Sequence, residues 1–136
     1  MATRRTAACT IQDARQRLRT AQAYADVANL VLNESQQDEY LNVAAGLAVL
    51  AGIAASDAIC CARLHRRHRG DDHRAAVDLI SSAVPDGKRL AAQLVRLLDV
   101  KDAAHYGIQV VVPRSARDAL KSAQRLINRA RDEVER

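Results

Sequence analysis

Residues 43–62 read VAAGLAVLAGIAASDAICCA, and this stretch decides the fold class. Only Ser56 and Asp57 are clearly polar within it. The stretch is nearly long enough to cross a bilayer, but a carboxylate inside hydrocarbon is costly, which argues against a membrane span. A helix that neighbours surround on all sides is equally apolar around its circumference. We therefore predict a central, buried helix over residues 39–65 and expect no membrane association.

The rest of the chain supplies helices that can surround this segment. The 136 residues contain no Phe and no Trp, so the core must be built from Ala, Leu, Val and Ile. Five Gly and two Pro are too few for a protein of strands and turns. The sequence predicts an all-α fold, a four- to five-helix up-down bundle that forms a single domain over residues 10–136. Apolar residues at helical spacing place the other helices near residues 10–32, 72–84, 88–106 and 115–134.

Local signals set the ends of these helices. Thr10 and Asp13 have the spacing of a capping box. Asp71 or Asp72 is expected to cap the third helix, and Ser115 begins a capping signal for the last. The segments outside the helices are expected to be a mobile basic tail at residues 1–9, a charged loop at 66–72 and an extended connector at 108–113.

Charge and cysteine usage indicate the compartment. The formal net charge of +5 favours acidic partners without requiring them. The cysteines Cys9, Cys60 and Cys61 have no framework spacing, so we expect small buried thiols in a reducing compartment. No apolar core follows the initial MATRR, so no secretory signal is expected. Together these features predict a cytoplasmic protein.

The polar end of the fourth helix is the first candidate site. Residues 98–107 read LDVKDAAHYG, and Lys101 and His105 continue the leucine row of that helix one turn apart. Such a cation and imidazole can bind one phosphate, and the imidazole can move a proton. Asp102 and Tyr106 lie beside them. The alternative is a polar patch at a helix C-terminus, where Lys and protonated His favour the helix dipole.

A basic segment, RLHRRHRGDDHR at residues 63–74, is the second candidate site. It is either a phosphate-binding patch or a solvated loop. It contains no aromatic side chain that could stack on a base. We expect no metal site, because the arginines between its histidines would repel a cation, and no cofactor. The binding candidates here are Arg63, Arg66, Arg67, Arg69 and His73.

Asp57 is the third candidate, because it is the one carboxylate in the apolar stretch of residues 43–62. Burial of an unpaired carboxylate is costly, so the side chain demands a partner, which Arg63, Lys101 or His105 could supply. We predict that Asp57 lies near the polar end of the fourth helix, where it would orient His105. The alternative is a position at the end of the bundle that is exposed to water.

The helical layout, the LLDVKDAAHYG of residues 97–107 and the GDDH of residues 70–73 resemble the HEPN superfamily (higher eukaryotes and prokaryotes nucleotide-binding), especially an actinobacterial HEPN-like branch. Many members are metal-independent ribonucleases, often toxins paired with an antitoxin, whose active site lies between two subunits. The resemblance implies that Lys101 takes the place of the family's Arg, Asp102 that of the polar residue after it, and His105 approximately that of its His. Lysine lacks the bidentate fork of arginine.

The resemblance implies a homodimer that binds RNA or a nucleotide through a polar cleft at the end of the fourth helix, without necessarily cleaving it. One alternative is a metal-independent endoribonuclease toxin with an antitoxin partner protein. The other is a ligand-free helical protein for dimerisation or interaction.

Overall fold

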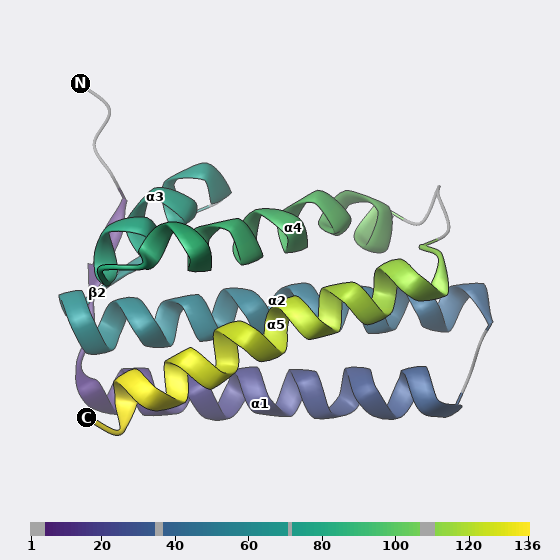
Figure 1. The fold of residues 1–136 in the computed structure, drawn as a ribbon, viewed down its shortest axis with the longest axis horizontal. Helices are drawn as coiled ribbons and strands as arrows, with labels where there is room; N and C mark the ends of the chain where they lie inside the picture. Colours follow the sequence, from purple (N-terminus) through teal and green to yellow (C-terminus); the bar gives the residue numbers. More distant parts are fainter. Residues whose placement is uncertain (1–4, 35–36, 71, 107–110) are drawn as a thin grey trace.

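Long antiparallel helices make up most of the structure, which confirms the predicted all-α bundle (Figure 1). The computed structural model describes residues 5–34, 37–70, 72–106 and 111–136, without the side chains of 102, 103 and 106. Helix α3 is short and lies over the end of the bundle where α4 begins. The elements are β1 (Thr6–Ala8), α1 (Ile11–Glu34), α2 (Asp38–Leu64), β2 (Arg66–His68), α3 (His73–Ala83), α4 (Gly87–Tyr106) and α5 (Pro113–Val134).

Helix α2 runs through the middle of the bundle and packs against α1, α3, α4 and α5. Among the described residues, α2 is the one helix that is long and apolar enough to cross a membrane. However, 72% of its most apolar window is buried by the rest of the protein. That burial fits the predicted core helix. A Cβ atom on Gly52 would lie 2.1 Å from Cδ1 of Leu97, so the glycine allows α4 to approach α2 closely.

The helix ends agree with the sequence in two cases and differ in a third. The backbone N–H of Thr10 donates to Oδ2 of Asp13 at 2.8 Å, and the N–H of Asp13 donates to Oγ1 of Thr10 at 3.1 Å, which confirms the capping box. Asp72 caps α3 by accepting a backbone N–H. The expected cap at Ser115 is wrong. Helix α5 begins two residues earlier at Pro113, whose fixed φ suits the first helical position.

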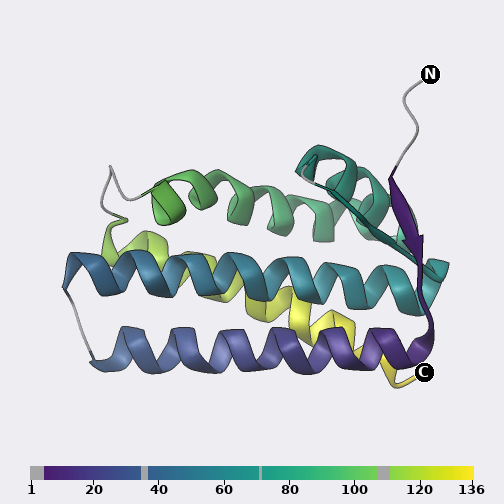
Figure 2. The ribbon, with the colours of Figure 1, turned by 180° about the vertical axis from the view of Figure 1, so that it is seen from behind.

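A small antiparallel sheet takes in residues 6–8 of the expected tail and residues 66–68 of the expected loop, whereas residues 1–4 and 71 lie outside the described residues (Figure 2). Thr6 pairs with His68, and Ala8 pairs with Arg66. The N–H of Cys9 continues the pairing by donating to the carbonyl of His65 at 2.9 Å. Strands of three residues are too short for a periodic pattern, so the sequence alone did not indicate them.

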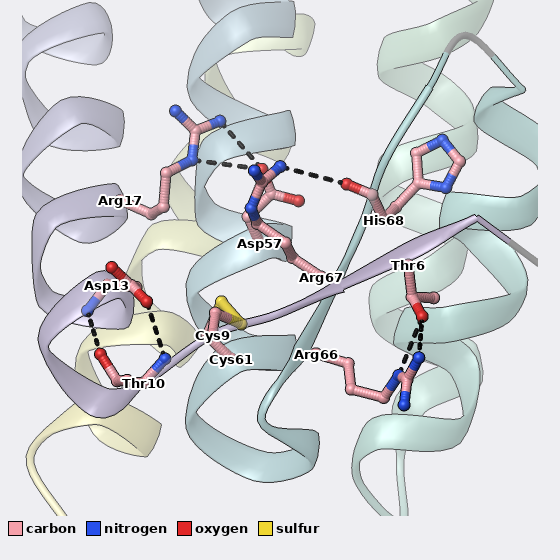
Figure 3. The surroundings of a disulfide bond; sticks show 10 residues. All are labelled: Thr6, Cys9, Thr10, Asp13, Arg17, Asp57, Cys61, Arg66, Arg67 and His68. Carbon is pink, nitrogen blue, oxygen red and sulfur yellow. Dashed lines mark hydrogen bonds and ion pairs between the residues drawn. A yellow bond between two sulfur atoms is a disulfide. The ribbon is translucent and has the colours of Figure 1, made fainter.

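A disulfide joins Cys9, just after β1, to Cys61 in the last turn of α2 (Figure 3). Their Cα atoms are 5.4 Å apart, so the expectation of free thiols is wrong for both residues. Cys60 is the buried free cysteine. Disulfides are typical of proteins that mature in oxidising compartments. The expected cytoplasmic location therefore loses the support that it drew from reduced cysteines.

Candidate functional site

A cavity of about 190 Å³ lies where α2, α3 and α4 meet β2 and the turn that follows it. The turn contains Gly70, whose backbone φ of +106° is rarely adopted by residues that have a side chain. The apolar lining of the cavity consists of Ile53, Ala76, Leu94 and Leu98. The polar lining comes from Ser56, Asp57, Arg67, His68, Arg69 and His73.

Ser56 presents an unpaired hydroxyl in this lining. The residue is 5% exposed. Among the buried side-chain atoms of the described residues, its Oγ is the one without a hydrogen-bond partner. A buried polar group left without a partner costs about 1–3 kcal/mol. Ser56 lines the cavity, so a group that approaches its Oγ closely from that side would supply the missing partner.

Asp57 is buried and paired with Arg17 of α1 (Figure 3). The Nε and Nη2 atoms of Arg17 donate to Oδ2 of Asp57 at 3.2 and 2.9 Å. The predicted pairing with Arg63, Lys101 or His105 is therefore wrong. Burial raises the pKa of Asp57 above its ordinary value, although the charge and hydrogen bonds of Arg17 oppose the shift. No hydrogen bond to Oδ1 occurs in the part of the chain that the structure describes.

The two-stranded sheet holds the basic segment in place. Arg66 donates from Nε to Oγ1 of Thr6 at 2.9 Å, so its guanidinium is held against the other strand. The N–H of Arg69 donates to the carbonyl of Arg5 at 3.0 Å, which anchors the turn backbone. Nε2 of His68 lies 3.1 Å from the carbonyl oxygen of Gly70. Arg67 and Arg69 therefore sit on a backbone fixed by a sheet, and the predicted loop is an ordered wall of the cavity.

Lys101 of α4 contacts His73 of α3, with 2.5 Å between Nζ and Nε2. An ammonium group carries only donors, so Lys101 donates in this contact and Nε2 of His73 accepts. This contact lies between the cavity and an open hollow of about 710 Å³; His73 lines both, and Lys101 lines the hollow. Lys101 thus belongs with the basic segment, a connection that the sequence did not indicate.

The other predicted site residues lie elsewhere. The ring of His105 lies over Gly46 of α2, since a Cβ atom there would be 3.6 Å from Nε2. Lys101 and His105 therefore contact different helices. The side chains of Asp102 and Tyr106 fall outside the described residues. Arg63 donates to the buried carboxylate of Glu133 in α5 at 3.1 Å, which gives it a structural partner.

Two residues of the site, Ser56 and Arg17, were not predicted from the sequence. A hydroxyl within the apolar stretch of α2 is the signal that marks Ser56. Arg17 lies three residues after Ala14 and four before Ala21, both fully buried, so its spacing placed it beside the core. No group of three or more His, Cys, Asp or Glu residues that could hold a metal ion occurs among the residues the structure describes.

Comparison with known proteins supports the fold alone. No family model matches the sequence. No curated protein matches it. The crystal structure of TT1696 from Thermus thermophilus is similar, with a TM-score of 0.67, 18% identity, and coverage of 88% of this chain and 97% of that one. These comparisons do not test the HEPN resemblance, which stays a prediction. The chain has the helical-bundle fold that it shares with TT1696.

Proposed function

We propose that this protein binds RNA or a nucleotide through its phosphate at the rim of the cavity, on Arg67, Arg69 and the Lys101–His73 pair. The observation that carries the proposal is that Arg67 and Arg69 line the cavity while Lys101 lies beside it, in contact with His73, which lines both the cavity and the neighbouring hollow. The net charge of +5 adds attraction for an acidic ligand. The site thus uses Lys101 as the sequence suggested, but with the basic segment in place of His105.

The geometry suits phosphate in two ways. Guanidinium groups form paired hydrogen bonds with phosphate oxygens. The segment that carries Arg67 and Arg69 is fixed by β1 and by the disulfide of Cys9, so less conformational entropy is lost on binding. Contacts of this kind bind the backbone of a nucleic acid without reading its sequence.

Binding is better supported than cleavage. The ribonuclease alternative needs Lys101 and His105 to address one phosphate, whereas Lys101 bonds to His73 and His105 lies over α2. We expect purified protein to leave RNA intact in the presence of EDTA. Cleavage that disappears in His105→Ala would favour the endoribonuclease, and an antitoxin partner would then be expected.

The experiment is a titration of fluorescently labelled single-stranded RNA, followed by anisotropy over a series of salt concentrations. Arg67→Gln and Arg69→Gln should each weaken binding and reduce the slope of log K against log salt by about 1 for each lost phosphate contact. Arg15→Gln is the matched control, because it removes the same charge from an exposed position on α1. An equal loss in the control would show that the attraction is general and that the site is misplaced.

Self-association is a second candidate function. It corresponds to the homodimer that the HEPN resemblance implies. Val27 and Leu30 near the end of α1 are 47% and 61% exposed, and Tyr40 and Val43 near the start of α2 are each 50% exposed. Large apolar side chains in such numbers favour contact with another apolar surface. Light scattering on the wild type and on Leu30→Glu tests this, and a monomer for both proteins would contradict it.

A further inference from the structure

The cavity is built for a small, flat and partly polar group. Its volume of about 190 Å³ is below the roughly 300 Å³ at which pockets begin to enclose drug-sized ligands. A single heterocycle fits this limit, and a complete nucleotide does not. Leu94 and Leu98 of α4 and Ile53 of α2 offer apolar surface to ring faces.

The polar groups inside the cavity do not suit a phosphate. Asp57 presents a carboxylate whose Oδ2 is held by Arg17, which leaves Oδ1 to accept a hydrogen bond from an N–H group. A phosphate at that depth would face a like charge. Ser56 adds a hydroxyl that can donate to a ring nitrogen or a carbonyl and that has no partner among the described residues. An acceptor beside a donor is the complement of the hydrogen-bonding edge of a nucleobase.

We infer that the cavity receives the base of a nucleotide, with the base edge on Asp57 and Ser56 and the phosphate outside on Arg67 and Arg69. The inference rests on the proposed function and adds a base-binding pocket to it. The ligand class is a mononucleotide, or one unstacked nucleotide of an RNA strand. The base lies between apolar side chains without an aromatic partner, so hydrogen bonds at its edge supply most of the specificity.

The first experiment compares ligands by calorimetry on the intact, oxidised protein. The probes are AMP, GMP, CMP, UMP and ribose 5-phosphate, which keeps the sugar and the phosphate but lacks a base. We expect at least one nucleotide to bind about tenfold more tightly than ribose 5-phosphate, because a buried base edge gains hydrogen bonds to both a hydroxyl and a carboxylate.

The second experiment removes one hydroxyl. Ser56→Ala should weaken the binding of the preferred nucleotide about fivefold and leave the affinity for ribose 5-phosphate unchanged. It should not lower the melting temperature, since the wild-type hydroxyl has no partner to lose among the described residues. Ser122→Ala is the matched control, because Ser122 is also a buried serine but lines a different hollow on α5. We expect it to leave nucleotide affinity unchanged.

The outcomes separate the two proposals. If ribose 5-phosphate binds as tightly as all four nucleotides, or if Ser56→Ala and Ser122→Ala behave alike, the base pocket is overturned while phosphate binding stands. If neither the nucleotides, ribose 5-phosphate nor RNA binds at low salt, the proposed function fails and the base pocket fails with it.

Discussion

Arg17 of α1 reaches across to the carboxylate of Asp57 in α2, with 2.9 Å between Nη2 and Oδ2. This pair lets a charged residue lie within the long apolar stretch of α2. The guanidinium is one-third exposed, whereas the carboxylate is nearly buried. The cost of desolvation therefore falls on Asp57, and Arg17 offsets part of it.

Arg17→Ala should destabilise the fold in a pH-dependent way. Burial raises the pKa of Asp57 in the folded protein, so the folded state binds the proton more tightly than the unfolded state. Stability is then lost as the pH rises from the unfolded value of about 3.9 through the raised folded value. Loss of Arg17 raises the folded pKa further, so the carboxylate becomes more costly at neutral pH. We expect a loss of about 2 kcal/mol at pH 7, after allowance for the exposed guanidinium.

Urea denaturation at pH 7 and near pH 4 measures this difference. The effect of Arg17→Ala should shrink at the lower pH, where Asp57 becomes protonated. Asp57→Asn is the control, because in that background the loss of Arg17 should show little pH dependence. An effect of Arg17→Ala that is equal at both pH values would contradict the coupling.

The disulfide predicts a clear count of thiols. Oxidised protein unfolded in denaturant should expose one reactive thiol, that of Cys60, and a count of three would contradict the Cys9–Cys61 bond. In the folded protein Cys60 should react slowly, because burial raises its thiol pKa to about 12. Cys9→Ser should lower stability by about 4 kcal/mol on the chain-entropy estimate for a loop of this length, whereas Cys60→Ser keeps the bond.

The features predictable from the sequence are those encoded locally. Helical spacing identified the buried row of α5 from Ala116 to Val134, because each turn of an amphipathic helix repeats the same signal. The capping box of Thr10 and Asp13 was readable because its partners lie three residues apart. Such patterns determine elements, and the apolar character of α2 determined which element lies at the centre.

The features that could not be predicted from the sequence depend on segments that meet only in the folded chain. Arg17 and Asp57 are 40 residues apart, and the disulfide spans 52. Which of several arginines pairs with Asp57 follows from how α1 packs on α2, and periodicity does not specify this. The cavity likewise arises where β2 and the turn after it meet α2, α3 and α4. The sequence therefore predicted the basic segment as a candidate without predicting its shape.

Glu133 should be one of the most sensitive positions in the bundle. Its side chain is fully buried, and it pairs with Arg63 of α2 at 3.1 Å and with Arg129 at 2.9 Å. Glu133→Ala leaves Arg63 without a carboxylate partner and Arg129 with Asp86 alone, so we expect a loss of about 3 kcal/mol in urea denaturation. Asp86→Ala is the control, because it removes another partner of Arg129 at an exposed position and should barely move the urea midpoint. Equal effects of the two variants would contradict a structural role for Glu133.

Opening the disulfide should weaken RNA binding as well as stability. Cys9 fixes the end of β1, and β1 pairs with the strand that carries Arg67. Without the bond, the basic segment gains conformational freedom that must be lost again on binding, so affinity falls although no charge is removed. We expect Cys9→Ser to bind labelled RNA several-fold more weakly than Cys60→Ser at the same salt concentration, with an unchanged salt slope because the phosphate contacts are the same. Both variants must be assayed where circular dichroism shows them folded. Equal affinities in the two folded variants would show that the sheet of β1 and β2 does not preorganise the site.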